Sequence, residues 1–240
     1  MYRKTEPETI QAMFGSIATS YDRANAILSL GFHKYWNQAL VKAVSKPQVK
    51  VLLDLCAGTG EIAFAFLKRN PNAKATLIDF CGEMLEVAEK KGSPLRGRFS
   101  TLVGDAQAIP LPNTSVDAVT IAYGIRNVQD PHRCFEEVYR VLSPNGQFGI
   151  LELTRPSSSF LRLGHRMYLR TLLPLLGKWV AKDHSAYRYL SESIGAFISP
   201  ELLVASLQKV GFVNIRCQTL MGGVANLILM HKPSRCNVIC

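Results

Sequence analysis

With 240 residues, 48% of them hydrophobic, the chain has room for one large core and is short for two, so we expect a single domain over residues 1–240. Its 28 basic residues against 18 acidic ones give a formal charge of +10, which favours a polyanionic partner or an anionic membrane surface. The apolar runs are far shorter than the roughly 20 residues that span a bilayer, and the charged N-terminus lacks a signal-peptide pattern, so a cytoplasmic location is expected.

Two further ligand classes are disfavoured by the composition. The six cysteines are scattered without a CxxC pair, which predicts free thiols and neither a metal site nor a disulfide framework. The basic residues are spread along the chain and no nucleic-acid motif is present, so we expect no nucleic-acid partner.

In chain order, residues 1–45 come first and show helical periodicity. A short apolar run at 49–56 then ends in a glycine-rich turn, and helical spacing follows at 61–69. This strand, turn and helix pattern recurs, which predicts a parallel sheet covered by helices on both faces. The recurring pairs are 73–80 with 82–91, 99–106 with a proline-rich loop, 116–125 with 131–142, and 147–154 with a long basic segment.

The C-terminal part departs from this alternation. A helix-like stretch at 200–210 is followed by strands at 213–220 and 224–232, and a connection that short makes the two strands antiparallel. The sequence therefore predicts an α/β fold with a seven-stranded, mostly parallel sheet and an antiparallel last strand. Residues 1–45 and an insertion at 155–199 are predicted to form a helical lid and a helical cover over the substrate cleft.

The strongest chemical signal is the turn from Asp54 to Gly60, at the carboxyl end of the first strand. Open parallel sheets bind ligands at this edge. Gly58 and Gly60 let the backbone approach a ligand closely, and Asp79, which ends the second strand, is placed to accept both hydroxyls of a ribose.

The same glycines also fit the GxGxxA form of the dinucleotide fingerprint, so an NAD-dependent oxidoreductase stays open as an alternative. Asp54 favours a different cofactor, because a carboxylate ahead of the glycines would repel a pyrophosphate but can pair with the amino group of a methionine moiety. A sulfonium-bearing cofactor tolerates that charge.

Asp105 and Ala106 end the third strand, where an acidic side chain and a backbone N–H can bind an adenine edge. Each of the three aspartates, at 54, 79 and 105, could singly be no more than a strand terminator. Together, on successive strand ends, they predict a cofactor cleft.

The motifs LLDLCAGTGE, IDFCGEML, GDAQAIPLP, AYGIRNV and GGVANLILMHK together resemble the UbiE/MenG/Coq5 family of quinone-biosynthetic methyltransferases. The N-terminal FGSIATSYDRANAILSLGFHKYW and the later AYRYLSESIGAFISPELL are also similar to segments of that family. The resemblance covers nearly the whole chain and, within the family, is greatest to the bacterial menaquinone-pathway members.

The resemblance implies a class I, Rossmann-like fold and S-adenosylmethionine as cofactor. It implies methyl transfer to a ring carbon of reduced demethylmenaquinone, a prenylated quinol. The expected cofactor residues, from the turn and from the resemblance, are Asp54, Gly58, Thr59, Gly60, Asp79, Asp105, Ala106 and Ala122.

The chain departs from the family pattern at a few positions near this cleft. Ala122 stands where some members have serine, so one hydrogen bond to the cofactor is missing. Cys56 and Ala57 differ from the small or glycine residues common there, and Cys81 replaces a residue type that would cap the following helix. None of these changes removes an acidic contact.

Methylation of a ring carbon needs an electron-rich ring, so the acceptor is expected to be the hydroquinone. Arg126, at the end of the fourth strand, is the predicted catalytic residue, either stabilising the developing phenolate or orienting a basic water. Without the surrounding motif, an arginine at a strand end is more often a surface or ion-pair residue.

In the N-terminal segment Asp22, Asn25 and Ser29 are spaced to line one helical face. We predict that Tyr21, Asn25 and His33 line the quinol pocket, with Tyr21 or His33 touching a ring oxygen. The alternative is that Ser29 caps a helix and that Trp36 serves ordinary packing.

From 153 to 182 the chain has no acidic residue, and arginines at 162, 166 and 170 repeat along one helical face. That pattern suits anionic headgroups and an isoprenoid tail, so peripheral membrane contact is expected. The alternative is a cover whose leucines face the sheet and whose arginines face solvent.

Three rival functions and one assembly stay open. A ubiquinone-pathway benzoquinol methyltransferase uses the same ring chemistry, and the ring cannot be read from the residues. A noncatalytic scaffold of a quinone-biosynthetic complex and an oxidoreductase are the others. A homodimer is compatible with the chain.

Overall fold

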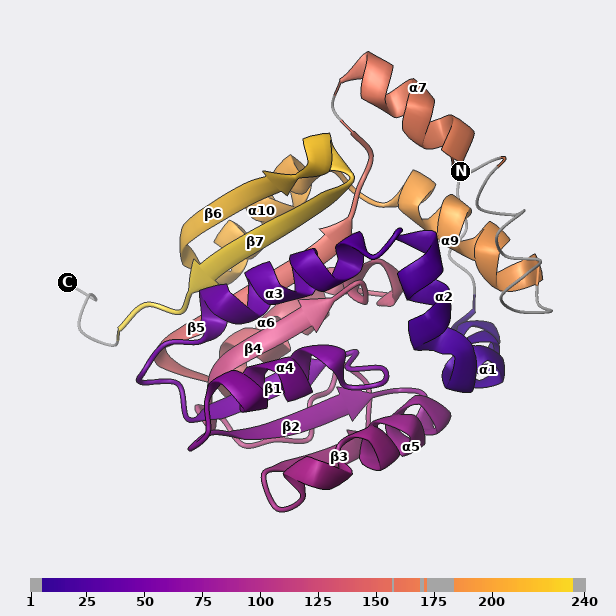
Figure 1. The fold of residues 1–240 in the computed structure, drawn as a ribbon. Helices are drawn as coiled ribbons and strands as arrows, with labels where there is room; N and C mark the ends of the chain where they lie inside the picture. The colour runs from indigo at the N-terminus through magenta and orange to yellow at the C-terminus, as the bar shows by residue number, and fades with distance from the viewer. Residues whose placement is uncertain (1–5, 157, 169–170, 172–183, 235–240) are drawn as a thin grey trace.

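The structure is a computed structural model that describes residues 6–156, 158–168, 171 and 184–234. Its centre is a seven-stranded sheet with strand order β3-β2-β1-β4-β5-β7-β6 (Figure 1). The first five strands along the chain pair in parallel, and β7 runs antiparallel to both neighbours, as expected. The strands are β1 (Val51–Leu55), β2 (Lys74–Asp79), β3 (Phe99–Val103), β4 (Val116–Ala122), β5 (Leu142–Leu153), β6 (Val213–Leu220) and β7 (Ala225–His231).

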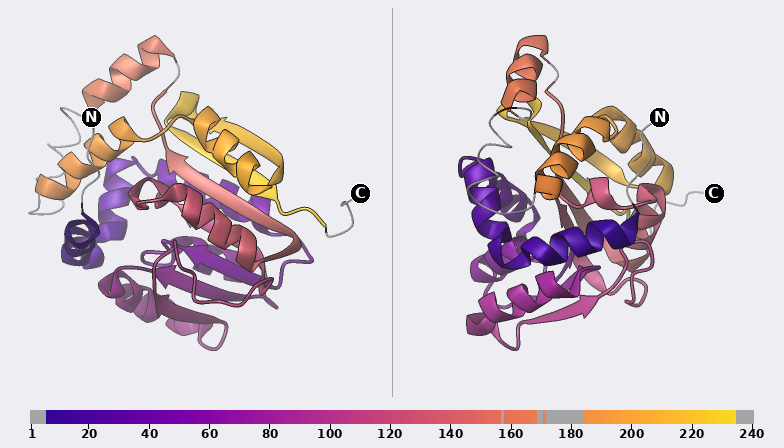
Figure 2. Two further views of the ribbon diagram at one scale, coloured as in Figure 1. Left: turned by 180° about the vertical axis from the view of Figure 1, so that it is seen from behind. Right: turned by 90° about the vertical axis from the view of Figure 1, so that its right-hand side faces the viewer.

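Helices cover both faces of this sheet (Figures 1 and 2). One face carries α3 (Phe32–Val44), α4 (Glu61–Arg69) and α5 (Gly82–Lys91), and the other carries α6 (Pro131–Val141) and α10 (Pro200–Val210). Short 3-10 helices complete the connections: η1 (Ala18–Ser20), η2 (Ser93–Leu95), η3 (Ile125–Asn127) and η5 (Met221–Gly223).

Two hydrophobic clusters lie on the two sides of the sheet. Side chains of α3, α4 and α5 form one of them with Leu52 and Leu77. Side chains of α6 and α10 form the other, around Phe135 and Phe148, whose rings meet edge to face 6.2 Å apart. Because β1 and β4 are buried on both faces, their apolar runs are nearly continuous. The buried Thr120 within β4 is satisfied by Asp54 of β1.

Some strand limits differ from those expected. The prediction that the fifth strand begins at 147 is wrong, since β5 begins at Leu142, where Val116 pairs with it and the register shifts before Ala118. The residue pattern that predicts a strand fails there because Pro144 and Gly146 interrupt the apolar run. The backbone nevertheless stays extended. The third strand ends at Val103, since Gly104 turns the chain into the following loop.

The two additions predicted to cover the cleft contribute helices at the carboxyl edge of the parallel strands. There, α1 (Pro7–Ile17) and α2 (Tyr21–Leu28) lie beside α9 (His184–Ala196) (Figure 1). Helix α7 (Ser159–Met167) lies at the turn between β6 and β7, with Leu161 against Gly222. The limits at 45 and 155–199, and the single domain, stay predictions.

No single helix among the described residues is long and apolar enough to cross a bilayer. One bent pair, Tyr189–Gly195 with Pro200–Val210, reaches the length and apolarity of a span but is kinked by 70°. Its second member, α10, buries Leu203 and Leu207 against the sheet, as the core helix of a globular domain does.

Candidate active site

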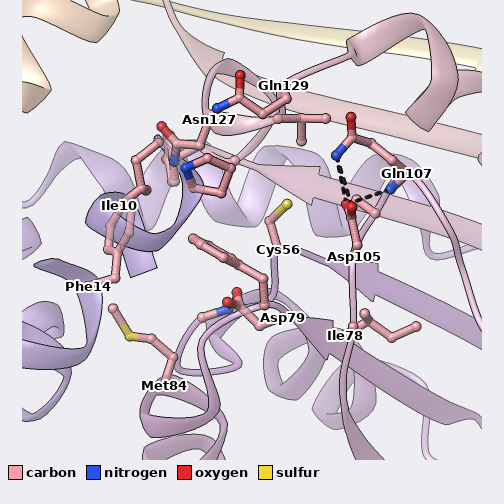
Figure 3. Close-up of a pocket in the computed structure, with 18 of the residues that line it drawn as sticks. Ile10, Phe14, Cys56, Ile78, Asp79, Met84, Asp105, Gln107, Asn127 and Gln129 are labelled. Atoms are coloured by element: carbon pink, nitrogen blue, oxygen red, sulfur yellow. Dashed lines mark hydrogen bonds between the residues drawn. The ribbon is translucent and has the colours of Figure 1, made fainter. Parts of the chain in front are cut away.

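A cavity of about 210 Å³ lies at the carboxyl ends of β1 to β4, between these strands and the N-terminal helices (Figure 3). We call it the strand-end cavity. Its wall combines backbone of the glycine turn, acidic strand ends and apolar side chains of α1. Lining residues include Ile10, Phe14, Tyr21, Cys56, Gly58, Asp79, Asp105, Ala106, Ala122 and Tyr123.

The turn after β1 has a backbone conformation that few residue types accept. Cys56 has φ of 53°, Gly58 of 53° and Gly60 of 79°, all in the left-handed region. A Cβ at Gly60 would lie 2.5 Å from the Phe64 ring, so only glycine fits there. A Cβ at Gly58 would meet open space, which leaves room for a ligand beside the backbone.

Asp79 organises this turn from the end of β2. Its Oδ2 accepts a hydrogen bond from Gly58 N at 2.8 Å, and its Oδ1 accepts one from Cys81 N at 2.9 Å. The side chain is buried, and burial raises the pKa of its carboxyl. Cys81 supplies no side-chain cap to α5, in keeping with its departure from the family pattern. Figure 3 shows Asp79 below Cys56, at the floor of the cavity.

Asp54 is buried deeper, at 1% exposure. Its Oδ1 accepts from Thr120 Oγ1 at 2.7 Å, and its Oδ2 accepts from Ala63 N at 3.2 Å. Burial, opposed by these hydrogen bonds, raises the pKa of its carboxyl to about 7. The carboxyl borders a small cleft of about 40 Å³ next to Gly58, so it holds the turn and still reaches a ligand space.

The third acidic residue, Asp105, lines the strand-end cavity together with Asp79. Asp105 Oδ1 accepts from Gln107 N at 2.9 Å, and both carboxylate oxygens accept from Gln107 Nε2 at 3.0 Å (Figure 3). Ala106 and Ala122 line the same wall. Asp79 and Asp105 therefore line the strand-end cavity, and Asp54 lines the small cleft, which shares Cys56 and Gly58 with it. Their role in binding a cofactor stays a prediction.

Thr59 faces the N-terminal helices. Its Oγ1 donates to Asp22 Oδ1 at 2.5 Å, and Lys91 Nζ donates to Thr59 Oγ1 at 3.1 Å and to Asp22 Oδ2. Asp22 thus fastens α2 to the glycine turn. It does not border the outer cavity described next, so Asp22, Asn25 and Ser29 do not share one pocket face.

A second cavity, of about 230 Å³, adjoins the first. Tyr21 and Tyr123 line both, so we call the second one the outer cavity. Most of its wall is apolar, and Leu30, Phe32 and Met221 on that wall are 67%, 44% and 46% exposed. The remaining lining residues are Asn25, Leu28, Ser29, His33, Trp36, Arg126, Leu153, Tyr168, Leu190, Ile194 and Val224.

Among the described residues that line the outer cavity, Arg126 is the one that carries a charge, and it is 8% exposed. Its Nη1 donates to Glu152 Oε1 at 2.6 Å and to Tyr123 O at 2.5 Å. Burial opposes the guanidinium charge most strongly, but the charge and hydrogen bond of Glu152 together with the neighbouring tyrosines outweigh it, so the Arg126 pKa is raised. The arginine therefore stays cationic, and its hydrogen bond to Tyr123 ties it to the junction of the two cavities.

The predicted substrate residues all line the outer cavity. Burial raises the pKa of Tyr21 and lowers that of His33, so both are neutral near pH 7. His33 Nδ1 lies 2.7 Å from Ser29 Oγ, which itself donates to Asn25 O at 2.6 Å. Trp36 is buried in the α3 cluster.

Two contributors were not predicted. Glu152, the counter-ion of Arg126, is a lone acid inside the apolar run of β5, and that interruption was a usable signal. Tyr123 has φ of 58° and donates from its hydroxyl to Asn37 Oδ1 at 2.9 Å, while Asn37 Nδ2 donates to Glu61 Oε2 at 3.0 Å. These hydrogen bonds connect the loop after β4, α3 and α4, which are far apart in the sequence, so no local pattern predicts them.

The basic segment is only partly described. In α7, Leu161 and Leu163 are 44% and 57% exposed, so these leucines do not cover the sheet. Arg162 Nε donates to Pro156 O at 3.2 Å. The side chains of 165 and 166, Arg170 and residues 172–183 lie outside the described residues.

Within the described part of the chain, no three histidine, cysteine or acidic side chains gather as metal ligands would. The four cysteines there, at 56, 81, 134 and 217, are free thiols.

The fold resembles that of solved methyltransferases. Phosphoethanolamine N-methyltransferase 2 of Haemonchus contortus, in complex with S-adenosyl-L-methionine, superposes with a TM-score of 0.62 at 15% identity. The match covers 82% of this chain and 52% of that one. Strand order and the antiparallel β7 thus give the class I, Rossmann-like methyltransferase fold, as predicted.

Sequence comparison gives the family. Residues 2–232 match the ubiE/COQ5 methyltransferase family. The demethylmenaquinone methyltransferase of Protochlamydia amoebophila (strain UWE25) is 47% identical over 239 residues, 98% of this chain and 99% of the relative. That of Chlamydia pneumoniae is 40% identical, over 97% of this chain and 100% of the relative. The chain belongs to the ubiE/COQ5 methyltransferase family, and the prediction of an S-adenosylmethionine-dependent methyltransferase is confirmed.

Proposed function

We propose that the protein transfers a methyl group from S-adenosylmethionine to a ring carbon of reduced demethylmenaquinone, giving menaquinol in menaquinone biosynthesis. The observation that carries this proposal is the meeting of the strand-end and outer cavities at Tyr21 and Tyr123. One cavity is acidic and glycine-walled, and the other is apolar with a few polar groups. Relatives named demethylmenaquinone methyltransferase support the choice of ring.

The residues of the strand-end cavity fit the cofactor. Asp79 and Asp105 offer carboxylates for ribose hydroxyls and an adenine edge, and Asp54 offers one for an amino group. The open space at Gly58 lets a bound cofactor lie close to the backbone of the turn. When bound, S-adenosylmethionine supplies an electrophilic methyl group on a sulfonium.

The outer cavity suits an aromatic ring with an apolar tail. Tyr21 and Tyr123 bring hydroxyl groups to the junction, and Arg126 is bonded to Tyr123. The exposed apolar residues Leu30, Phe32 and Met221 belong to the outer cavity alone. We infer that the ring binds at the junction and that the prenyl tail leaves past Leu30 and Met221. The apolar wall excludes water, which strengthens charge interactions inside.

Arg126 acts on the ring oxygen beside the methylated carbon. That oxygen first loses its proton to solvent, and the phenolate drives the ring carbon onto the methyl group while the bonding pair of the broken S–CH3 bond returns to sulfur. The oxygen is then a carbonyl until the ring carbon releases its own proton, which restores the phenolate, and this takes up a proton again. The neighbouring oxygen therefore carries negative charge as methyl transfer begins and again once the ring is aromatic. The guanidinium, held by Glu152, is fixed before the reaction, so stabilising that charge costs no reorganisation.

Contact with an anionic membrane surface, in the cytoplasm, is a second part of the proposal. The net charge of +10, the basic segment and the exposed Leu30, Phe32 and Met221 around the outer cavity support it. A homodimer and the absence of a nucleic-acid partner stay predictions.

The test is a mass-spectrometric methylation assay with purified protein, S-adenosylmethionine and short-tailed demethylated naphthoquinols and benzoquinols, each offered reduced and oxidised. Methyl gain on the reduced naphthalene ring alone is expected. Preference for the benzene ring would reassign the protein to the ubiquinone pathway. Cofactor binding without methyl gain on any ring would overturn the reaction and favour a scaffold.

A further inference from the structure

Two buried N–H groups in the outer cavity wall lack an acceptor among the described residues: Trp36 Nε1 and Arg126 Nε. Trp36 is 4% exposed and Arg126 is 8% exposed. A buried donor without an acceptor costs roughly 1–3 kcal/mol, so folded proteins seldom keep one without a reason. Both donors belong to residues that line the outer cavity, and a ligand with two acceptors in that cavity would satisfy them.

The indole of Trp36 is held firmly. It stacks on Phe32 with ring centroids 6.4 Å apart and planes 21° apart, and it belongs to the core cluster beneath α3. One turn earlier, His33 is held by Ser29. A tryptophan that served packing alone would need no N–H at this position, where phenylalanine has a similar apolar face.

Two other hydroxyl donors of the cavity already have acceptors. Tyr123 donates to Asn37, and Tyr168 donates to the backbone oxygen of Leu28. Trp36 lines the outer cavity and not the strand-end cavity, whereas Arg126 bonds to Tyr123 at the junction. The two unpartnered donors therefore differ in their distance from the methyl donor.

We propose that Trp36 Nε1 donates a hydrogen bond to the quinol oxygen farther from the methyl donor, while Arg126 serves the nearer one. The inference rests on the proposed function. A para-quinol carries its oxygens on opposite sides of the ring, so donors on both sides fix its rotation within the cavity. Trp36 is then a specificity-determining residue that selects which ring carbon meets the methyl group.

The test combines a one-group change in the protein with a one-group change in the ligand. Trp36→Phe keeps an aromatic ring and removes the N–H, and Tyr35→Phe, at a 62% exposed position one residue away, is the control. The ligands are a short-tailed demethylnaphthoquinol and the two naphthols that lack one hydroxyl each. Affinity is measured by calorimetry with S-adenosylhomocysteine present, and methylation by KM and kcat.

We expect removal of the far hydroxyl to weaken binding to the wild type about two- to tenfold, the value of one neutral hydrogen bond. Trp36→Phe should bind the quinol more weakly than the wild type by the same factor. It should bind the naphthol that lacks the far hydroxyl as tightly as the wild type does. In methylation, its KM should change more than its kcat. Tyr35→Phe should behave as the wild type. Equal losses for every ligand, or none, would overturn the subsite.

A second variant guards against misfolding. Replacing tryptophan by benzothienylalanine in a Trp179→Phe background keeps the bicyclic shape at position 36 and substitutes sulfur for N–H. It should reproduce the Trp36→Phe result, and full retention of far-hydroxyl discrimination would refute the hydrogen bond. If Trp36→Phe and removal of the far hydroxyl prove to be coupled in binding but no ring is methylated, the subsite stands and the proposed reaction is wrong. The two failures are therefore distinguishable.

Discussion

Asp54 makes cofactor affinity depend on pH. Its carboxyl has a pKa of about 7 in the ligand-free protein, because burial disfavours its charge. An ammonium group needs that charge, so affinity for S-adenosylhomocysteine should rise as the pH rises from 5.5 through 7, by up to about tenfold per unit below the pKa. Asp54→Asn should bind weakly with a flatter profile. Calorimetry across this range checks it, and parallel profiles for the two proteins would contradict it.

The buried pair Arg126–Glu152 separates stability from catalysis. Arg126→Ala leaves the Glu152 carboxylate buried without its partner and should cost about 3–5 kcal/mol of unfolding free energy. Arg126→Met with Glu152→Gln should recover most of that loss, because no charge remains.

Both Arg126 variants should lose turnover while they keep cofactor affinity. Chemical denaturation and single-turnover assays on the two variants check the pair. Recovery of turnover along with stability in the double variant would mean that the arginine is structural.

The site residues that could be predicted from the sequence are those whose signal lies in a short stretch of chain. The turn from Asp54 to Gly60 and the strand-end position of Asp79 are read from residue types and spacing alone, and the structure brings them to two cavities that share Cys56 and Gly58. The pairing of Arg126 with Glu152 joins η3 to β5, so it can be known only from the fold. The unpartnered Trp36 Nε1 is likewise visible only once every neighbour is placed.

At the scale of elements, α3 packs on β5 through a glycine. A Cβ at Gly149 would lie 2.6 Å from Leu40 Cδ1 and 3.1 Å from Val44 Cγ1. Gly149→Ala should therefore push α3 from the sheet and lower the unfolding free energy by about 1–3 kcal/mol. Gly164→Ala in α7, with no atom within 4 Å, is the control and should leave stability unchanged or higher. Urea titration checks both, and equal effects would refute the packing argument.

The contact of α2 with the glycine turn is a second element-scale feature. Lys91 and Asp22 are each 33% exposed, so Lys91→Met should change unfolding by only about 0–1 kcal/mol. The same change should speed proteolysis within α1 and α2 in cofactor-free protein, since Asp22 and Thr59 lose their shared cation. Lys90→Met is the matched control. Unchanged cleavage would show that other contacts hold these helices.

Element limits show where periodicity succeeds and fails. Helices α4, α5 and α10 begin and end where their apolar spacing predicts. The start of β5 was missed because Pro144 and Gly146 look like a turn, although pairing with β4 keeps that stretch extended. The start of β5 is therefore set by its pairing with β4 and not by the strand preference of its own residues.

For the whole molecule, the net charge and the exposed apolar residues at the outer cavity predict binding to anionic vesicles. Leu30→Asp should reduce co-sedimentation, because it places a carboxylate where lipid would lie. Leu202→Asp, on α10 and 62% exposed, is the matched control. Binding by the wild type should weaken as salt is raised. Equal losses in both variants, or no sedimentation at any salt concentration, would refute this surface.

The sharing of Tyr21 and Tyr123 by two cavities has a consequence for inhibition. A single molecule that joins an adenosyl group to a naphthol through a short linker at the sulfur position would occupy both spaces at once. Such a bisubstrate compound pays the entropy of association once for two sets of contacts. Because α2 supplies Tyr21 to the junction, its selectivity among proteins with this sheet would come from the N-terminal helices.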